Sequence, residues 1–206
     1  MIRSNSKVYK FKISIGDSLD YAKKYIDNAI VHIIEKKPNI MCQVNNYKSI
    51  TIYDLLNNKK NGYYVELGAF HSKVGSNTWR LENEYDWNGV SFEIVPDFHE
   101  EIVANRKNPC ILGDATKFNY WKYFEENNFP KQIDFLQVDV DSSYNQLGRP
   151  QGDPAQSLKA LLALPLNTYR FTFITFEHDA CIDYKAKDIR DAQREILHSY
   201  GYNMIA

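Results

Sequence analysis

The sequence contains 206 residues with a mass of 24.1 kDa, of which 44% are hydrophobic and 25% are charged. This length is enough for one sizeable hydrophobic core and hardly for two, so we expect a single globular unit. Lys and Arg number 25 against 26 Asp and Glu, which leaves a net charge of −1 at pH 7. Such a balance excludes a long-range electrostatic field that would attract nucleic acid or an anionic membrane.

The cysteines and the first residues favour a cytoplasmic protein. Cys42, Cys110 and Cys181 are far apart and lack the spacing of metal ligands, which is typical of a reducing compartment. Residues 1–10 lack the apolar run of a signal peptide, and no apolar stretch is long enough to span a bilayer. We therefore expect a soluble, cytoplasmic protein with neither nucleic acid nor membrane as a partner.

The first 60 residues predict a strand and a helix that cover the core. Apolar and polar residues alternate over residues 9–15, the period of a half-buried strand. Asp17 or Ser18 could cap a helix that Pro38 closes. The apolar stripe of this helix contains Leu19, Ala22, Ile26, Ala29, Ile30 and Ile33. We interpret residues 1–60 as an N-terminal cap and residues 61–206 as the principal domain.

From residue 63 onward the sequence alternates between strands and helices. The predicted strands cover residues 63–66, 90–95, 110–112, 133–140 and 171–176. The first predicted helix begins near residue 75 or 76, and further helices are predicted over residues 96–106, 118–126, 155–164 and 188–200. This order predicts an α/β, Rossmann-like fold, with a mostly parallel twisted sheet and helices on both faces.

The last predicted strand raises the question of what covers the edge of the sheet. Residues 171–176 read FTFITF, and such an apolar strand would be an aggregation hazard at an open edge. The chain stops at residue 206, just as a further strand begins, so its C-terminal strands are short or missing. We expect residues 202–206, the N-terminal strand, a partner subunit in a homodimer, or a missing C-terminal segment of a longer protein to cover this edge.

Polar side chains gather at the carboxyl ends of the predicted strands, where open α/β sheets bind ligands. Taken singly, each is more often a cap or a solvated turn, but five successive strands ending in acids indicate a ligand site. These residues are Glu66, Glu93, Asp114, Asp139, Asp141, Glu177, His178 and Asp179.

Residues 63–95 predict what kind of ligand binds. A strand ending at Glu66 turns through Gly68 into a helix, and Glu93 follows about 25 residues after Gly68, near the spacing at which an acid accepts hydrogen bonds from a ribose. The turn, GAFHSKVG, lacks both the glycine pattern of dinucleotide sites and the phosphate loop. A cofactor with a ribose, an adenine and a positive charge, but no pyrophosphate, therefore fits best.

The chain resembles the FkbM-type methyltransferases, within the class I S-adenosylmethionine-dependent fold, over residues 62–202. The segments that carry the resemblance are VELGAFHSKVGSNTWRLE, FEIVPDFHEEIVANR, GDAT, IDFLQVDVD and YRFTFITFEHD. The resemblance implies S-adenosylmethionine as cofactor and a hydroxyl of a sugar, glycan or secondary metabolite as acceptor.

The resemblance also implies roles for single residues. Glu66 and Gly68 would lie under the methionine moiety, and Glu93 would hold the ribose. Asp139 would face the site of methyl transfer. The remaining implied cofactor contacts are Ala69, Ser76 and Asn77 at and before the helix start, Ile94 after the acid, and Asp114 with Ala115 beside the adenine.

Two departures from the family pattern bear on substrate and completeness. The family commonly follows the acids of the fourth strand with Gly and an acidic residue, whereas Asp141 is followed here by Ser142, Ser143 and Tyr144. This departure leaves the identity of the hydroxyl acceptor open. Class I methyltransferases also usually finish with two more strands, the last inserted antiparallel, and this chain has at most the start of one.

Two routes could remove the proton of a hydroxyl acceptor. His178 has the side chain whose ordinary pKa suits a base near neutrality, although a histidine at a strand end often only satisfies a hydrogen bond. The alternative is Mg²⁺ held by Asp139 or Asp141 with Glu177 and Asp179. Asp139 and Glu177 thus join His178 as candidate catalytic residues.

Two other classes of function stay open. One is a nucleotide-binding oxidoreductase, against which the absent glycine pattern argues. The other is a non-catalytic cofactor-binding module, one part of a larger protein, with which the short C-terminal end of the sequence is compatible.

Overall fold

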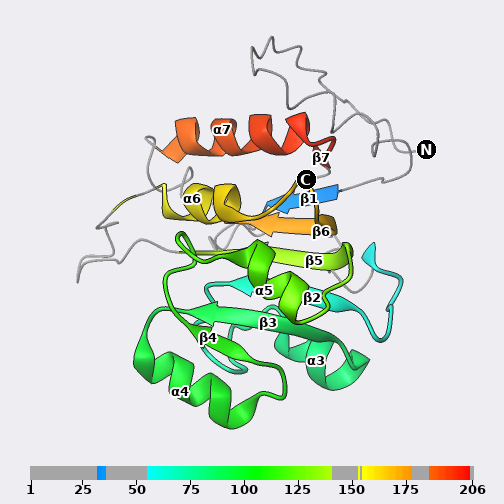
Figure 1. Cartoon of the computed structure of the whole chain (residues 1–206), viewed down its shortest axis with the longest axis vertical. Coiled ribbons are helices and arrows are strands. Elements are labelled where there is room, and N and C mark those ends of the chain that lie inside the picture. The colour runs from blue at the N-terminus through cyan, green and yellow to red at the C-terminus, as the bar shows by residue number, and fades with distance from the viewer. Residues whose placement is uncertain (1–31, 36–54, 141–152, 154, 178–185, 205–206) are drawn as a thin grey trace, which may run out of the picture.

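The computed structural model describes residues 32–35, 55–140, 153, 155–177 and 186–204. Within them a seven-stranded sheet, parallel throughout, has the strand order β4-β3-β2-β5-β6-β1-β7 (Figure 1). The strands are β1 (His32–Glu35), β2 (Tyr63–Leu67), β3 (Asn88–Glu93), β4 (Cys110–Leu112), β5 (Gln132–Val138), β6 (Arg170–Phe176) and β7 (Asn203–Met204).

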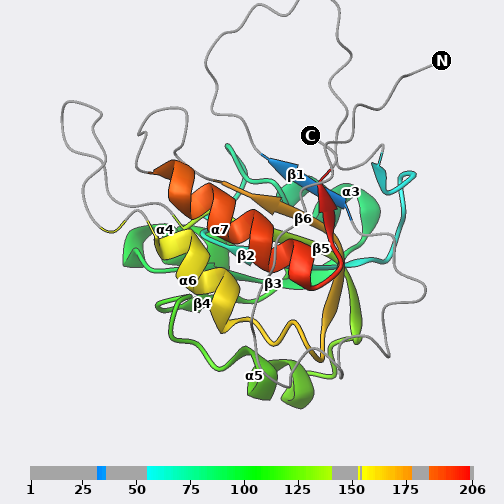
Figure 2. The same ribbon diagram turned by 90° about the horizontal axis from the view of Figure 1, so that it is seen from above.

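Helices cover both faces of the sheet. They are α3 (Trp79–Tyr85), α4 (Pro96–Asn105), α5 (Tyr120–Glu126), α6 (Gln156–Ala163) and α7 (Ala186–Ser199). Buried side chains of α5, α6 and α7 pack on one face, where Figure 2 shows α6 and α7 side by side. Leu81 of α3 packs on the other face, and α4 contacts β3 and β4. The predicted α/β, Rossmann-like class is therefore confirmed.

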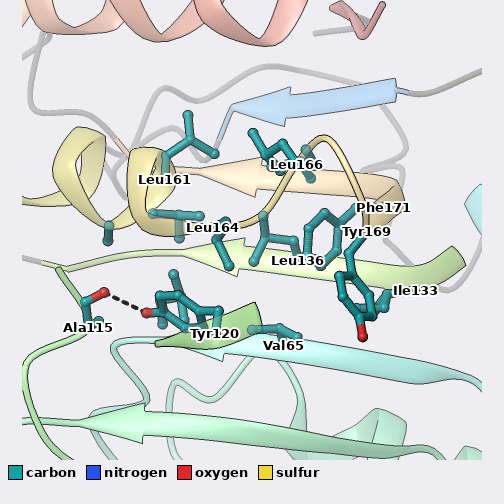
Figure 3. Close-up of a cluster of buried hydrophobic side chains, with 14 of the residues drawn as sticks. Val65, Ala115, Tyr120, Ile133, Leu136, Leu161, Leu164, Leu166, Tyr169 and Phe171 are labelled. Atoms are coloured by element: carbon teal, nitrogen blue, oxygen red, sulfur yellow. Dashed lines mark hydrogen bonds between the residues drawn. The ribbon is translucent and has the colours of Figure 1, made fainter. Parts of the chain in front are cut away.

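Successive side chains of strand β2 point to opposite faces of the sheet and enter different cores. Val65 and Leu67 enter the larger core with the helices α5 to α7, whereas Tyr64 enters the smaller core with Leu81. In the larger core the Tyr120 hydroxyl donates to the carbonyl oxygen of Ala115 at 2.6 Å (Figure 3). This bond satisfies a phenol that the apolar packing would otherwise leave unpaired.

The five strands predicted from residue 63 onward are confirmed, within a few residues at their ends. The predicted helix that includes Ile33 is wrong at its end, because His32–Glu35 form strand β1 beside β6, with His32 opposite Phe173 and Glu35 opposite Phe176. Consecutive β-branched residues, Ile33 and Ile34, suit a strand, and the open edge of β6 supplies backbone partners. The predicted strand over residues 9–15 and the rest of that helix lie outside the described residues.

The apolar strand β6 is not an edge strand. It lies between β5 and β1, and β7 pairs with β1, with His32 opposite Asn203. Segments from both ends of the chain therefore cover this side of the sheet, and both run parallel to it. Among the described residues, no helix is long and apolar enough to cross a lipid bilayer.

We expect Leu136→Ala to lower the free energy of unfolding by about 2–5 kcal/mol, because Leu136 is fully buried on central strand β5 and its truncation leaves a cavity. Leu162→Ala on α6 is the control. Its side chain is 59% exposed, so its effect should stay within about 0.5 kcal/mol. Urea unfolding measures both, and equal losses would contradict this location of the core.

Candidate functional site

The strand order places a topological switch point at the carboxyl ends of β2 and β5. The chain runs outward from β2 to β3 and β4, then crosses to β5 on the opposite side of β2. At such a reversal the connections leave the sheet in opposite directions, and open α/β sheets bind ligands there. Gly68 follows β2 and Asp139 follows β5, so two of the predicted site residues lie at this switch point.

Gly68 and Asp139 are in close backbone contact. The N–H of Asp139 donates to the carbonyl oxygen of Leu67 at 2.9 Å, and the N–H of Gly68 donates to that of Phe92 at 3.0 Å. Gly68 has a φ of 82°, and a Cβ atom there would lie 1.9 Å from the Asp139 carbonyl oxygen. Only glycine fits this position.

Glu93 closes the turn that follows Gly68. Its Oε2 accepts a hydrogen bond from the Phe70 N–H at 2.8 Å, and its Oε1 accepts from the N–H groups of Ile94 at 2.9 Å and Val95 at 2.8 Å. Phe70 has a φ of 60°, a conformation that a bulky residue rarely adopts without such support. A carboxylate offers about four lone-pair sites, so roughly one remains for a ligand.

Apolar side chains stand exposed around Glu93. Phe70 is 55% exposed, Ile94 62% and Leu112 49%. Leu112 pairs with Glu93 across β4 and β3, so the two side chains lie on the same face of the sheet. Ala69 is buried, and its N–H donates to the Phe92 carbonyl oxygen at 3.1 Å. Exposed apolar side chains thus follow or pair with the residues that form the Glu93 turn.

Asp114 lies one residue beyond a backbone contact with Glu93. Gly113 N–H donates to the Glu93 carbonyl oxygen at 2.9 Å. The Asp114 carboxylate accepts from Lys117 Nζ at 2.7 Å and from Thr116 Oγ1 at 2.6 Å, and these hydrogen bonds, that of Lys117 first, lower its pKa to about 2. Ala115 is buried. Asp114 is therefore a carboxylate at neutral pH. It follows Gly113, whose N–H contacts Glu93 at the end of β3.

Ser76 organises the start of helix α3. Its Oγ accepts hydrogen bonds from the N–H groups of Thr78 at 3.3 Å and Trp79 at 3.0 Å, so it satisfies donors that the helix leaves unpaired. Asn77 next to it is partly exposed.

A second acid, Glu101 of α4, holds the same loop from the other side. Ser72 Oγ donates to Glu101 Oε1 at 2.6 Å, and His71 Nδ1 lies 2.8 Å from Oε2. The Ser72 hydrogen bond and then that of His71 lower the pKa of Glu101. Residues 69–72 are thus tied to β3 by Glu93 and to α4 by Glu101. Glu101 is not among the site residues predicted from the sequence.

Glu66 lies inside the protein in an ion network with Arg106 and Glu82, all three with side chains only 1% exposed. Glu66 Oε2 accepts from Thr78 Oγ1 and Ser91 Oγ, each at 2.7 Å, and from Arg106 Nη1 at 3.3 Å. The predicted contact of Glu66 with a methionine moiety stays a prediction. The structure shows that Glu66 supports the start of α3 through Thr78.

Arg106 joins the parts of this network. Its Nε donates to Glu82 Oε2 at 2.9 Å, and its Nη2 donates to the Tyr64 hydroxyl at 2.8 Å and to Thr78 Oγ1 at 2.7 Å. Burial by itself lowers the pKa of Arg106, but Glu66, Tyr64 and Glu82 outweigh it and raise that pKa above its ordinary value. The only sequence signal for Arg106 is its place in the FkbM-like segment FEIVPDFHEEIVANR.

The predicted catalytic residues are described only in part. Asp139 and Glu177 follow neighbouring parallel strands, and the Glu177 N–H donates to the Val138 carbonyl oxygen at 2.9 Å, so the structure brings these two together. His178, Asp141 and Asp179 lie outside the described residues. Within the described part of the chain, no three His, Cys, Asp or Glu residues form a group suited to a metal ion.

We expect Gly68→Ala to destabilise the fold by about 2–4 kcal/mol, because a methyl group would overlap the Asp139 carbonyl and the backbone is left-handed. Gly75→Ala is the matched control. Gly75 has a φ of 79° with nothing within 4 Å of the added Cβ, so only the left-handed cost of about 1–2 kcal/mol remains. Thermal or urea unfolding separates the two, and equal losses would contradict the close approach.

We expect Arg106→Met to cost about 3–5 kcal/mol of unfolding free energy, because it leaves two buried carboxyl groups without their cation. Arg80→Met removes an exposed pair with Glu84 four residues along α3, and should cost no more than about 0.5 kcal/mol. Urea unfolding at neutral pH measures both variants. A small loss for Arg106→Met would show that the network tolerates removal of its centre.

Comparison with known proteins does not place the chain in a family. No family model matches the sequence, and no curated protein matches it. A crystal structure of a quinone oxidoreductase from Pseudomonas syringae pv. Tomato DC3000 is similar over 75% of this chain and 52% of that one, with 12% identity and a TM-score of 0.35. The chain spans about half the length of that protein, and so distant a likeness carries no argument about activity.

Proposed function

We propose that the protein is an S-adenosylmethionine-dependent methyltransferase that methylates a hydroxyl group of a sugar, glycan or secondary metabolite. The observation that carries the proposal is the topological switch point between β2 and β5, where Gly68 contacts Asp139 and Glu93 closes the turn that follows β2. The FkbM-like segments of the sequence support the same function. The turn lacks the glycine pattern of a dinucleotide site, which argues for a cofactor without a pyrophosphate.

The surroundings of Glu93 suit an adenosine. Its carboxylate already accepts three backbone N–H groups, so a ribose with two hydroxyls would use the remaining lone pair and replace one of these bonds. The ribose would replace the hydrogen bond from the Phe70 N–H, because losing that bond lets Phe70 leave its left-handed backbone conformation. The exposed side chains of Ile94 and Leu112 offer apolar area to the purine.

Methyl transfer from a sulfonium is an in-line displacement, so the protein must align donor and acceptor and exclude water. The methyl acceptor would approach from the ends of β5 and β6, where Asp139 and Glu177 follow adjacent strands. The proton of its hydroxyl would pass to His178 as base. Alternatively, Mg²⁺ held by the acids at these strand ends would make that hydroxyl more acidic. The base and the metal are rival parts of the proposal.

We expect calorimetry with S-adenosylhomocysteine to detect binding to the wild type and a roughly 10- to 100-fold weaker affinity for Glu93→Ala, the loss that follows from removing one charged hydrogen bond. Glu126→Ala is the control, since Glu126 is an exposed acid paired with Lys122 on α5 and should leave affinity unchanged. Circular dichroism of each variant verifies folding.

The outcomes of this titration separate the rival functions. No binding of S-adenosylhomocysteine by the wild type would refute the proposal, and binding of NAD(H) in its place would favour an oxidoreductase. Undiminished binding by Glu93→Ala would remove only the ribose role of Glu93. Binding without methyl transfer to a panel of sugars would favour a non-catalytic module. Turnover unchanged by a chelator would exclude the metal, and full activity of His178→Ala would exclude the base.

A further inference from the structure

A row of polar residues crosses the middle of the sheet. Ser91, Glu66, Gln137 and Thr175 are register partners on the adjacent strands β3, β2, β5 and β6. Residues paired in this way point to the same face of a sheet. Glu66 and Gln137 are therefore neighbours, and both are buried.

Glu66 and Gln137 each leave one oxygen unsatisfied. Among the described residues, neither Glu66 Oε1 nor Gln137 Oε1 has a hydrogen-bond partner, although both atoms are buried. The donors that reach Glu66 all go to Oε2. An ionised carboxylate and an amide oxygen are both acceptors, so they cannot satisfy one another. Two buried acceptor oxygens without donors, on side chains that are register neighbours, are costly and call for a donor that can satisfy both.

The charges around Glu66 do not balance if it is ionised. Glu66, Glu82 and Arg106 are equally buried, which would place two negative charges beside one positive charge. Glu82 is the better carboxylate, because it accepts from Arg106 Nε, the Tyr64 hydroxyl and the Lys107 N–H. A second buried anion without its own cation carries a large desolvation cost.

The other titratable groups packed around Glu66 offer no compensating charge. Tyr64 on β2 is a neutral phenol, and burial raises its pKa further. Burial is the main cause that raises the pKa of the Cys110 thiol on β4 to about 12, so this thiol carries no charge either. Asp139 lies beyond Gln137, whose Nε2 donates to Asp139 Oδ2 at 3.4 Å. Arg106 is thus the one cation on Glu66 among the described residues.

We propose that Glu66 is a neutral carboxylic acid at neutral pH and that its Oε1–H donates a hydrogen bond to Gln137 Oε1. One proton then satisfies both unpaired oxygens, leaves Oε2 free to accept its three donors, and reduces the buried charges to the pair of Arg106 and Glu82. The bond joins β2 to β5 two residues before Gly68 and Asp139. This inference is independent of the proposed methyltransferase function.

A buried carboxylic acid makes stability depend on pH in a definite direction. Burial is the main cause that raises the pKa of Glu66 above its ordinary value of 4.5. The folded protein then holds a proton that the unfolded chain releases, so stability falls as the pH rises from about 4.5 through the raised folded pKa. Replacing the acid with an amide removes this dependence, because glutamine offers the same donor and acceptor at every pH.

Glu66→Gln and Glu82→Gln form a matched pair that tests the proposal in the full chain. At pH 8, Glu66→Gln should keep or raise the urea midpoint, because an amide N–H replaces the hydroxyl that donates to Gln137. Glu82→Gln removes the ionised partner of Arg106 and should lower the midpoint by roughly 1–2 M. An equal fall for both variants would overturn the proposal.

Infrared spectroscopy supplies a second measurement that does not depend on the stability of the variants. The wild type at pH 7 should show the C=O stretching band of a protonated carboxyl group, which Glu82→Gln keeps and Glu66→Gln loses. Absence of that band from the wild type would overturn the proposal and would indicate an ionised Glu66 facing a rotated Gln137 amide. If Glu66→Gln does not fold, the wild-type spectrum alone decides.

Discussion

A single guanidinium group holds together the elements that flank the turn after β2. Arg106 follows α4, yet its nitrogen atoms reach β2 through Glu66 and Tyr64, and α3 through Glu82 and Thr78. Three elements that are separate in the sequence thus share one cation, without which Glu82 would lose its buried counter-ion and Glu66 one of its donors. The glycine turn begins two residues after Glu66, and Ser76 in the same loop also touches Arg106. The shape of the turn therefore depends on charges that no ligand needs to touch.

Much of the fold could be predicted from the sequence, because the five strands β2 to β6 are largely apolar runs bounded by glycine or polar turns. Strand β1 was missed because Ile33 also fits the apolar stripe of a helix. The segment forms a strand because it pairs with the backbone of β6, and the sequence does not show that pairing. Gly68, Glu93 and Asp139 could be found by their places at strand ends. The partners of Glu93, and the burial of Glu66 and Arg106, could not, since a charged residue looks the same in sequence whether it faces water or the interior.

The site combines a rigid part with an adaptable part. The contact of Gly68 with Asp139 has no spare space, so the β2 and β5 ends are fixed relative to each other. Phe70 instead holds a left-handed backbone through one bond to Glu93, and its ring packs edge-on against Phe98 at 4.6 Å and His71 at 4.2 Å. A ligand at Glu93 would compete for that bond, which couples occupancy of the site to the conformation of the aromatic cluster.

The place of β1 between β6 and β7 has a consequence for folding. The pairs that join residue 32 to residues 173 and 203 close very long loops, and such contacts raise the contact order and slow the search for the native topology. During synthesis β1 emerges long before either neighbour, so it must wait without its partners until β6 has left the ribosome. The apolar β6 is then exposed until β1 docks. Until this side of the sheet is complete, the apolar β6 edge is open to pairing with another chain.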